Sequence, residues 1–271
     1  MKISIFGLGY VGCVGAACLA KLGHQVIGVD VNENKVRLMN EGKPTIIEEG
    51  IAELCAEAHE KGLMRATTDV KDAVMNTDVS FIVVGTPSSK EGHLNLSYIY
   101  NVAQQIGDAL RGKELKSEGV NELMGGLRHI IAIRSTVLPG TNEKVGKMIE
   151  EASGLVRGKD FTVVSNPEFL REGTSVEDYF NPPLTLVGIV CIQQIKLNTT
   201  NVNTPYISMN LIVGVRNIDH HRIAVLVKLT LDGQRTEVLC LVVSNLLTVH
   251  RQTLREVAET IQETHSTHID I

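Results

Sequence analysis

The sequence predicts an α/β protein with a doubly wound, mainly parallel sheet, followed by a C-terminal segment of unassigned fold. Three observations lead to this prediction. Short apolar runs alternate with stretches of helical periodicity over about the first 190 residues. The first strand, helix and strand fit within 30 residues. The alternation then stops near residue 190, so we expect one domain at 1–190 and an unassigned tail at 191–271.

The first unit begins with an apolar run at 2–6, which predicts a buried strand. Apolar positions from Val11 to Leu22 then recur at helical spacing, and residues 24–30 predict a second strand. Two strands joined through a helix run parallel, so this is a βαβ unit.

The later elements follow the same alternation. Helices are expected at 32–42, 51–62, 71–77, 96–112 and 141–153, and strands at 78–85, 128–135 and 160–165. Glycines end the first two of these helices, and Asn95 or Ser97 caps the long one. Residues 112–126 carry glycine and charge at both ends, which indicates a surface excursion.

The tail has a different character. It opens with a stretch rich in Asn and Thr. The apolar runs at 222–231 and 238–249 fit strands or apolar segments of undecided type, and 252–265 fits a short helix.

Composition excludes several classes of protein. The 271 residues are 43% apolar and 21% charged, as in soluble globular proteins. A net charge of −5, no Trp and few aromatic residues argue against a nucleic-acid partner. No apolar run reaches the roughly 18 residues of a membrane span. The apolar start resembles a signal peptide, but its glycine spacing explains the same residues better.

The five cysteines are scattered. None forms a C-x-x-C pair, so we expect neither a metal site nor a redox pair, and an odd number without a framework fits the cytoplasm.

Gly7, Gly9 and Gly12 form a G-x-G-x-x-G motif between the first strand and its helix, and Asp30 ends the next strand. This context predicts a Rossmann-like dinucleotide site. Gly7 permits the tight turn, Gly9 lets a pyrophosphate approach the backbone, and Gly12 lets the helix pack closely. Alternatively, the glycines serve packing alone.

The helix start near Tyr10 and Val11 presents free N–H groups to phosphates. The carboxylate of Asp30 accepts hydrogen bonds from a ribose diol and repels a 2′-phosphate, which favours NAD over NADP. Lys35 and Arg37 lie within reach of the ribose, although at least one of them is expected on a solvated helix face.

Three loops follow predicted strand ends, where ligands bind in such sheets. Thr86 and Thr136 lie in the first two and could donate hydroxyls to a cofactor or water; helix capping or turn formation is the alternative. The third loop, "NPEFLREG", carries Glu168 and Glu172. On a helix these two would share a face as an acid–base pair, or Asn166-Pro167 would start a helix whose dipole favours the glutamates.

Together these segments resemble one family, the NAD-dependent nucleotide-sugar 6-dehydrogenases. The resemblance covers about residues 1–188 and rests on five segments: "ISIFGLGYVG", "GHQVIGVDVN", "DVSFIVVGTPS", "IRSTVLPGT" and "NPEFLREGTSVEDYFNPPLTLVG". Three of them, "DVSFIVVGTPS", "RSTVLPGT" and "PPLTLVG", look more like GDP-mannose dehydrogenase than UDP-glucose dehydrogenase.

The resemblance implies a chemistry. The family oxidises the C6 alcohol of a nucleotide sugar to the acid in two hydride transfers to two NAD⁺. A cysteine attacks the intermediate aldehyde, the thiohemiacetal becomes a thioester, and water releases the acid. The implied substrate is GDP-mannose, with UDP-glucose as the alternative, in polysaccharide biosynthesis such as that of alginate.

The resemblance also implies roles for individual residues. The expected NAD contacts, beside the three glycines, are Tyr10, Val11, Asp30, Lys35, Thr86 and Thr136. Thr136 and Glu172 would lie near the catalytic water, and Glu168 and Leu170 near the cofactor or the sugar.

The family's second half is not recognisable after residue 190. Its G-G-S-C-x-P-K-D type motif with the nucleophile is absent, so the activity is expected to be incomplete, and a non-catalytic NAD-binding module is the alternative. The helical region through which the family dimerises is not recognisable either, which leaves a homodimer open. A truncation or a frameshift near codon 190 would produce this break. The frameshift version fails if the other frame encodes no such motif.

Overall fold

The computed structural model describes residues 1–88, 92–113, 129–182, 185–191, 209–219, 222–231 and 235–243. Most of the excursion expected at 112–126 and the helix expected at 252–265 lie outside these ranges.

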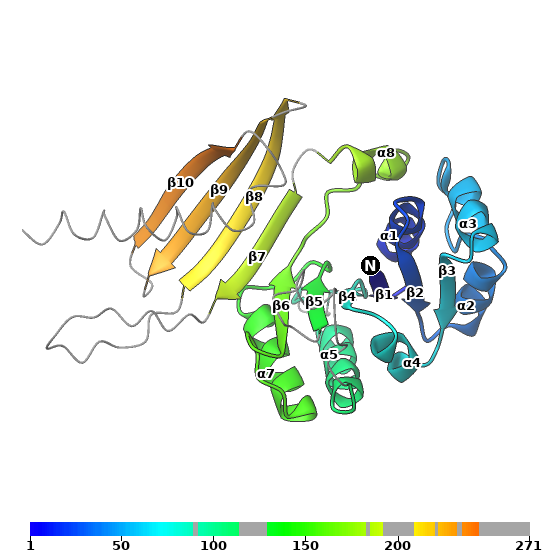
Figure 1. The fold of residues 1–271 in the computed structure, drawn as a ribbon, viewed down its shortest axis with the longest axis horizontal. Coiled ribbons are helices and arrows are strands. Elements are labelled where there is room, and N and C mark those ends of the chain that lie inside the picture. The colour runs from blue at the N-terminus through cyan, green and yellow to red at the C-terminus, as the bar shows by residue number, and fades with distance from the viewer. Residues whose placement is uncertain are drawn as a thin grey trace, which may run out of the picture.

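A parallel sheet forms the centre of the N-terminal part (Figure 1). Its strands are β1 (Lys2–Phe6), β2 (Gln25–Val29), β3 (Met64–Thr67), β4 (Val79–Ile82), β5 (His129–Ile133) and β6 (Phe161–Ser165). They pair in the order β3-β2-β1-β4-β5-β6, and each of these pairs is parallel. This confirms the predicted doubly wound fold, whose strand order reverses between β1 and β4.

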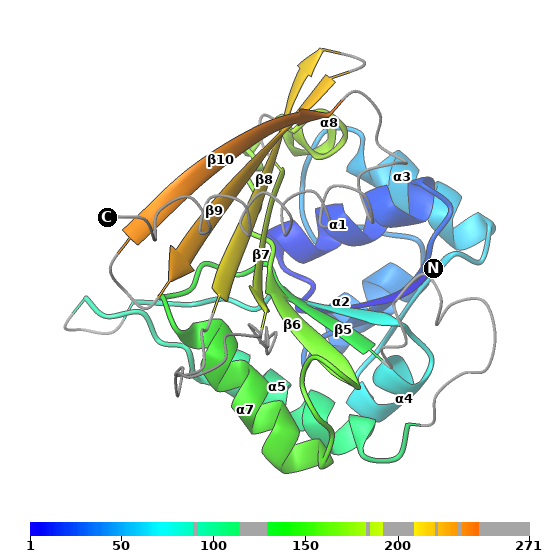
Figure 2. The ribbon, with the colours of Figure 1, turned by 60° about the vertical axis from the view of Figure 1, so that its left-hand side comes forward.

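Helices cover both faces of this sheet (Figures 1 and 2). One face carries α1 (Tyr10–Lys21), α2 (Glu33–Asn40), α3 (Ile51–Glu60) and α8 (Ser175–Phe180). The other carries α4 (Val70–Met75), α5 (Ser97–Leu110) and α7 (Thr141–Ser153). Each face has its own cluster of buried apolar side chains, because a parallel sheet must be covered on both sides.

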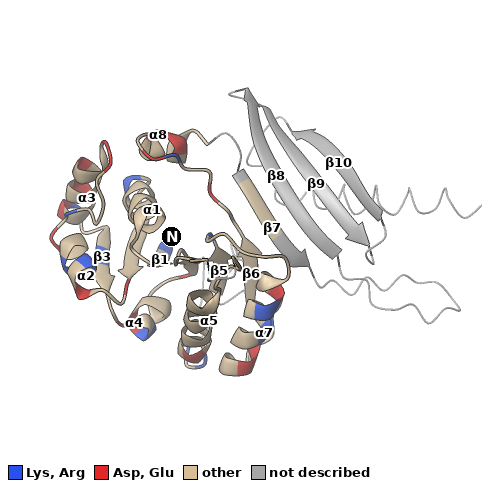
Figure 3. Ribbon diagram, turned by 180° about the vertical axis from the view of Figure 1, so that it is seen from behind, with Lys and Arg blue, Asp and Glu red and all other residues tan. Residues whose placement is uncertain are grey.

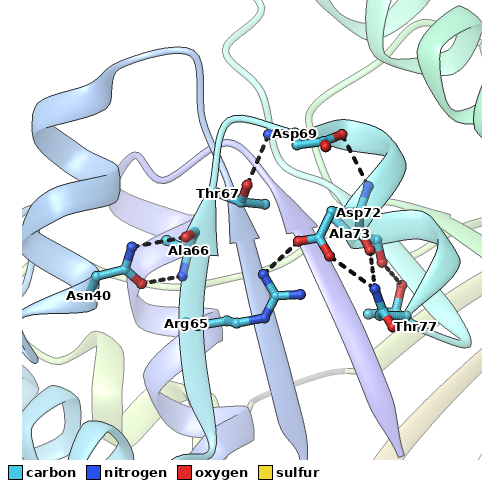
Figure 4. Close-up of polar contacts among 9 residues, drawn as sticks. Asn40, Arg65, Ala66, Thr67, Asp69, Asp72, Ala73 and Thr77 are labelled. Atoms are coloured by element: carbon cyan, nitrogen blue, oxygen red, sulfur yellow. Dashed lines mark hydrogen bonds and ion pairs between the residues drawn. The ribbon is translucent and has the colours of Figure 1, made fainter.

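Strand β3, which the sequence analysis did not separate from its surroundings, lies at an edge of the sheet. The side-chain amide of Asn40 donates to the carbonyl of Ala66 (2.9 Å) and accepts from the N–H of Ala66 (2.7 Å) (Figure 4). The Asn40 side chain therefore makes, at Ala66, the two hydrogen bonds that a neighbouring strand would make. This satisfies backbone groups that an edge strand would otherwise leave free.

Four antiparallel strands extend the sheet beyond β6 (Figure 2). They are β7 (Thr185–Cys191), β8 (Met209–Asp219), β9 (Arg222–Leu231) and β10 (Arg235–Val243). The apolar run at 222–231, left undecided from the sequence, is therefore a strand, and the run at 238–249 begins within one.

Charged residues of both signs lie on helices α2, α3 and α7 (Figure 3). Over the ranges described, no helix is long and apolar enough to cross a membrane. The same ranges contain no group of three or more His, Cys, Asp or Glu side chains arranged to hold a metal ion.

Candidate functional site

The glycine motif forms the turn between β1 and α1. Gly7 has a φ of +104°, and a side chain there would lie 2.6 Å from the carbonyl oxygen of Val83. A side chain on Gly12 would overlap the carbonyl oxygen of Gly7. Packing therefore accounts for these two glycines. It does not account for Gly9, because a side chain there would have no protein atom within 4 Å. The missing side chain of Gly9 leaves open space at the helix start.

The N-terminus of α1 lies beside that space. Gly9 is its N-cap residue and provides no side-chain cap, and the first turn holds no acidic residue. The first N–H groups of a helix have no partner within the helix. Those at Tyr10 and Val11, together with the positive end of the helix dipole, form a site suited to a phosphate group.

Asp30 joins the end of β2 to the glycine turn. Its carboxylate accepts from the N–H of Leu8 (2.8 Å) and from the N–H of Asn32 (2.9 Å). Lys35 pairs with the same carboxylate at 3.3 Å, and the Asp30 side chain is only 9% exposed. The structure thus brings Asp30 and Lys35 to the glycine turn, with the negative charge held firmly in place.

Arg37 points away from this group. Its guanidinium pairs with Glu41 at 2.8 Å on the exposed face of α2. The expectation that at least one of Lys35 and Arg37 belongs to a solvated face is confirmed for Arg37.

Thr86 and Thr136 lie in the loops after β4 and β5, which are neighbouring parallel strands. Thr86 is half-buried and Thr136 is exposed. The hydroxyl of Ser135 donates to the carbonyl of Val84 (2.7 Å), so the two loops are tied together. Both threonines therefore lie at the same edge of the sheet as the glycine turn.

The capping alternative does not hold for either threonine. The N-cap residue of α5 is Leu96, without a side-chain cap, so neither Asn95 nor Ser97 is the N-cap as expected; the side chain of Asn95 accepts from the N–H of Ser97 (3.0 Å). The N-cap residue of α7 is Gly140, four residues beyond Thr136.

The loop after β6, residues 166–174, is not helical. The next helix, α8, begins only at Ser175. Both helical interpretations of "NPEFLREG" were therefore wrong, and Glu168 and Glu172 do not share a helix face. Instead, the carboxylate of Glu168 accepts from the N–H of Leu170 (2.6 Å). A side chain that accepts from the backbone N–H two residues later is typical of a turn rather than of a helix. Glu168 and Leu170 are half-buried, and Glu172 is exposed.

The first residue of this loop is fastened by Arg134. The guanidinium of Arg134 donates to the side-chain oxygen of Asn166 (2.8 Å) and stacks over the ring of Tyr179 at 5.5 Å. The amide of Asn166 in turn donates to the carbonyl of Leu186 on β7 (2.9 Å). Arg134 thus links the end of β5, the start of the loop and α8.

The far end of the loop is fastened by Asp178 of α8. Its carboxylate accepts from the backbone N–H of Arg171 (3.0 Å) and pairs with the Arg171 guanidinium at 2.7 Å. The hydroxyl of Thr174 donates to it as well (3.1 Å). The hydrogen bond from Arg171 lowers the pKa of Asp178 to about 2, so this carboxylate stays ionised.

Glu48 is a site residue that the sequence analysis missed. It lies in the linker between α2 and α3, and it accepts from the hydroxyl of Tyr10 (2.7 Å) and from the N–H of Gly173 (3.0 Å). No local signal could have revealed it, because its partners are 38 and 125 residues away in the sequence.

The three cysteines whose surroundings are described, Cys13, Cys18 and Cys55, are free and buried. Burial raises the pKa of Cys18 to about 12. The hydrogen bond shared with Cys13, together with burial, raises the pKa of Cys55. Both effects suppress the thiolate at these two residues, which suits structural rather than nucleophilic cysteines.

Known proteins resemble this chain over the same region. Residues 1–206 match the UDP-glucose/GDP-mannose dehydrogenase family, NAD binding domain. A GDP-mannose 6-dehydrogenase from Pseudomonas aeruginosa is 51% identical over 189 residues, 69% of this chain and 41% of that protein. A UDP-glucose 6-dehydrogenase from Haloferax volcanii is 39% identical over the same shares of the two chains.

A solved structure agrees with these matches. The crystal structure of a ternary complex of GDP-mannose dehydrogenase from Pseudomonas aeruginosa superposes with a TM-score of 0.64 at 50% identity, covering 70% of this chain and 41% of that one. The chain thus spans about two fifths of the length of these relatives.

Proposed function

The chain belongs to the UDP-glucose/GDP-mannose dehydrogenase family, and from this we propose that it is the NAD-binding part of a nucleotide-sugar 6-dehydrogenase. The observation that supports the proposal most is the uncapped start of α1 beside the open space at Gly9. A Cβ atom on Gly9 would meet no protein atom within 4 Å, so the space beside this helix start is open, and the pyrophosphate of a dinucleotide is the kind of anion that such a helix start binds.

In this proposal the N–H groups of Tyr10 and Val11 hold the pyrophosphate. Asp30 accepts from a ribose diol through the carboxylate lone pairs that Leu8 and Asn32 leave over, and Lys35 lies beside it. The Asp30 charge disfavours the 2′-phosphate of NADP. The hydroxyls of Thr86 and Thr136 extend the site along the ends of β4 and β5.

The loop after β6 would face the reacting sugar. We propose that Glu172 and Thr136 orient the water that releases the acid, since both side chains are exposed at this edge of the sheet. Glu168 and Leu170 would line the sugar pocket. NAD⁺, when bound, supplies the hydride acceptor; the protein residues bind, orient and exchange protons.

GDP-mannose is the favoured substrate and UDP-glucose the alternative. The GDP-mannose relative is 51% identical to this chain, and the UDP-glucose relative 39% identical over the same length. The corresponding product is GDP-mannuronate, and we place the activity in the cytoplasm and in synthesis of a polysaccharide such as alginate.

A non-catalytic NAD-binding module is the second candidate. The observation that favours it is the absence from the sequence of the G-G-S-C-type motif that carries the family's nucleophile. Cys18 and Cys55 do not replace it, because both are buried with raised pKa values. The hydrogen bond with Cys55 lowers the pKa of Cys13 to about 6, but Cys13 is fully buried and no substrate reaches it in this structure.

Two measurements test these proposals. Titration calorimetry of the chain with NAD⁺ is expected to show binding, and no binding at millimolar NAD⁺ would refute both candidates. A turnover assay with GDP-mannose beside UDP-glucose then separates them. We expect NAD⁺ binding without complete four-electron turnover; two NADH formed per GDP-mannose would show that the chain is a complete enzyme.

A further inference from the structure

Glu48 collects hydrogen bonds from two segments that belong to different parts of the proposed site. One carboxylate oxygen accepts from the hydroxyl of Tyr10 (2.7 Å) and from the N–H of Gly173 (3.0 Å). The other accepts from the N–H of Ser175 (3.0 Å). Tyr10 is the first residue of α1, at the glycine turn, whereas Gly173 and Ser175 lie one and three residues after Glu172. One side chain therefore bridges the two.

The chemistry of this bridge requires a carboxylate. All three partners are donors, and an ionised carboxylate has acceptor sites only. The hydrogen bond from Tyr10, followed by that from Gly173, lowers the pKa of Glu48, so the group is ionised at neutral pH. Glutamine would place an NH₂ group against a donor.

The linker that carries Glu48 is itself attached to the glycine turn. The hydroxyl of Thr45 donates to the carbonyl of Leu8 (2.8 Å), within the G-x-G-x-x-G motif. A movement of the glycine turn would therefore reach Glu48 by two routes, through Thr45 and through the ring of Tyr10. Tyr10 offers its backbone N–H to the proposed pyrophosphate and its hydroxyl to Glu48.

We infer that Glu48 is a positioning residue that couples occupation of the glycine turn by NAD⁺ to the placement of the loop carrying Glu172. This inference rests on the proposed function, since it assumes that the dinucleotide binds at the start of α1. In this inference Glu48 contacts neither cofactor nor substrate. It acts through Tyr10 on one side and through the N–H groups of Gly173 and Ser175 on the other.

Hydrogen–deuterium exchange on the full chain, with and without NAD⁺, tests the coupling. In the parent, NAD⁺ should slow exchange both at 9–13 and at 170–176. In E48A, exchange at Gly173 and Ser175 should rise about tenfold without ligand, as expected when an amide loses its acceptor. Addition of NAD⁺ should then protect 9–13 but no longer 170–176.

Three further variants separate coupling from a general loss of structure. Glu49 is adjacent and exposed, and E49A should behave as the parent does. E48Q keeps the shape of the side chain and serves if E48A does not fold. Y10F keeps the backbone N–H and loses the hydroxyl that Glu48 accepts from, so it should transmit less protection to 170–176 than the parent but more than E48A, since one of two routes is cut.

The outcomes distinguish this inference from the proposed function. If the parent does not bind NAD⁺, the proposed function fails and the inference fails with it. If the parent binds NAD⁺ and E48A and E48Q still show ligand-dependent protection at 170–176, only the inference is overturned. Loss of that protection in the Glu48 variants, with binding retained and E49A unchanged, supports it.

Discussion

At the scale of single residues, the packing of α1 against the turn before it depends on which of its positions are glycine. Gly12 and Gly15 lie on the same buried helix one turn apart, yet their surroundings differ. A side chain on Gly12 would overlap the carbonyl oxygen of Gly7, whereas one on Gly15 would meet only a methyl group of Ile5 at 3.9 Å. Gly12 therefore has no room for a side-chain atom, whereas a Cβ on Gly15 would make an ordinary van der Waals contact.

We predict that Gly12→Ala destabilises the chain by about 1–3 kcal/mol, since the turn must move to relieve the overlap. It should also weaken NAD⁺ binding, because that turn presents the N–H groups. Gly15→Ala is the matched control and should be neutral or stabilising by up to about 1 kcal/mol, since alanine favours a helix more than glycine does. Urea unfolding and calorimetry measure both effects; equal losses in the two variants would contradict the prediction.

The sequence could predict the glycine turn because its signal is local. Gly7, Gly9, Gly12 and Asp30 fall within one βαβ unit, and their spacing follows from the geometry of that unit. Glu48 gave no such signal. Its role arises only when the linker after α2 meets the loop before α8, which is a tertiary contact.

At the scale of elements, the loop after β6 is held by side chains rather than by helical hydrogen bonds. Glu168 and Asp178 accept from backbone N–H groups within and beside it, and Gly173 has a φ of +91°. The sequence could not reveal this, since "NPEFLREG" also satisfies the composition of a helix start. Side-chain to backbone hydrogen bonds compete with a helix in such segments, and here they prevail.

The tie between Arg171 and Asp178 should depend on pH. The pKa of Asp178 is lowered to about 2, below the roughly 3.9 of an unfolded aspartate. Its stabilising effect is therefore fully present above about pH 4 and is lost as pH falls towards 2. The difference in unfolding free energy between the parent and Asp178→Asn should shrink over this interval. Denaturant titrations at pH 5 and pH 2.5 measure it, and a constant difference would rule out this tie.

The edge strand β3 gives a second prediction for an element. Asn40→Ala removes both hydrogen bonds to Ala66 and should cost about 1–3 kcal/mol, at about 0.5–1.5 kcal/mol for each bond. Asn40→Asp should cost more at neutral pH, since a carboxylate oxygen would then face the Ala66 carbonyl. Asn34→Ala, on the exposed face of the same helix, is the control. Chemical denaturation distinguishes them, and equal midpoints for the Asn40 and Asn34 variants would contradict the assignment.

At the scale of the whole molecule, the order of the six parallel strands could be predicted from the sequence, whereas the pairing of the tail strands could not. The six parallel strands alternate with helices, and right-handed crossovers leave few arrangements for them. The tail strands β8, β9 and β10 continue the same sheet as an antiparallel group. The sequence of an apolar run such as 222–231 does not indicate which strand it pairs with. That pairing depends on the sheet edge that forms only when β7 has paired with β6.

The proposed site exists only in the folded chain, because the ends of β1, β2, β4 and β5 must meet at one edge of the sheet. NAD⁺ should therefore stabilise the whole chain. At about 100 times its Kd the expected gain is about 2.7 kcal/mol. For a chain of this size that corresponds to a rise in Tm of roughly 5–10 °C.

NADP⁺ at the same concentration should raise the Tm by much less, because its 2′-phosphate would approach the ionised carboxylate of Asp30. Asp30→Ala removes that repulsion and should bring the two shifts closer together, although loss of the acceptor for Leu8 lowers the starting Tm. Gly12→Ala should reduce both shifts, since it disturbs the shared phosphate site. Differential scanning fluorimetry over a ligand series measures all of these, and equal shifts with NAD⁺ and NADP⁺ in the parent would refute the role of Asp30.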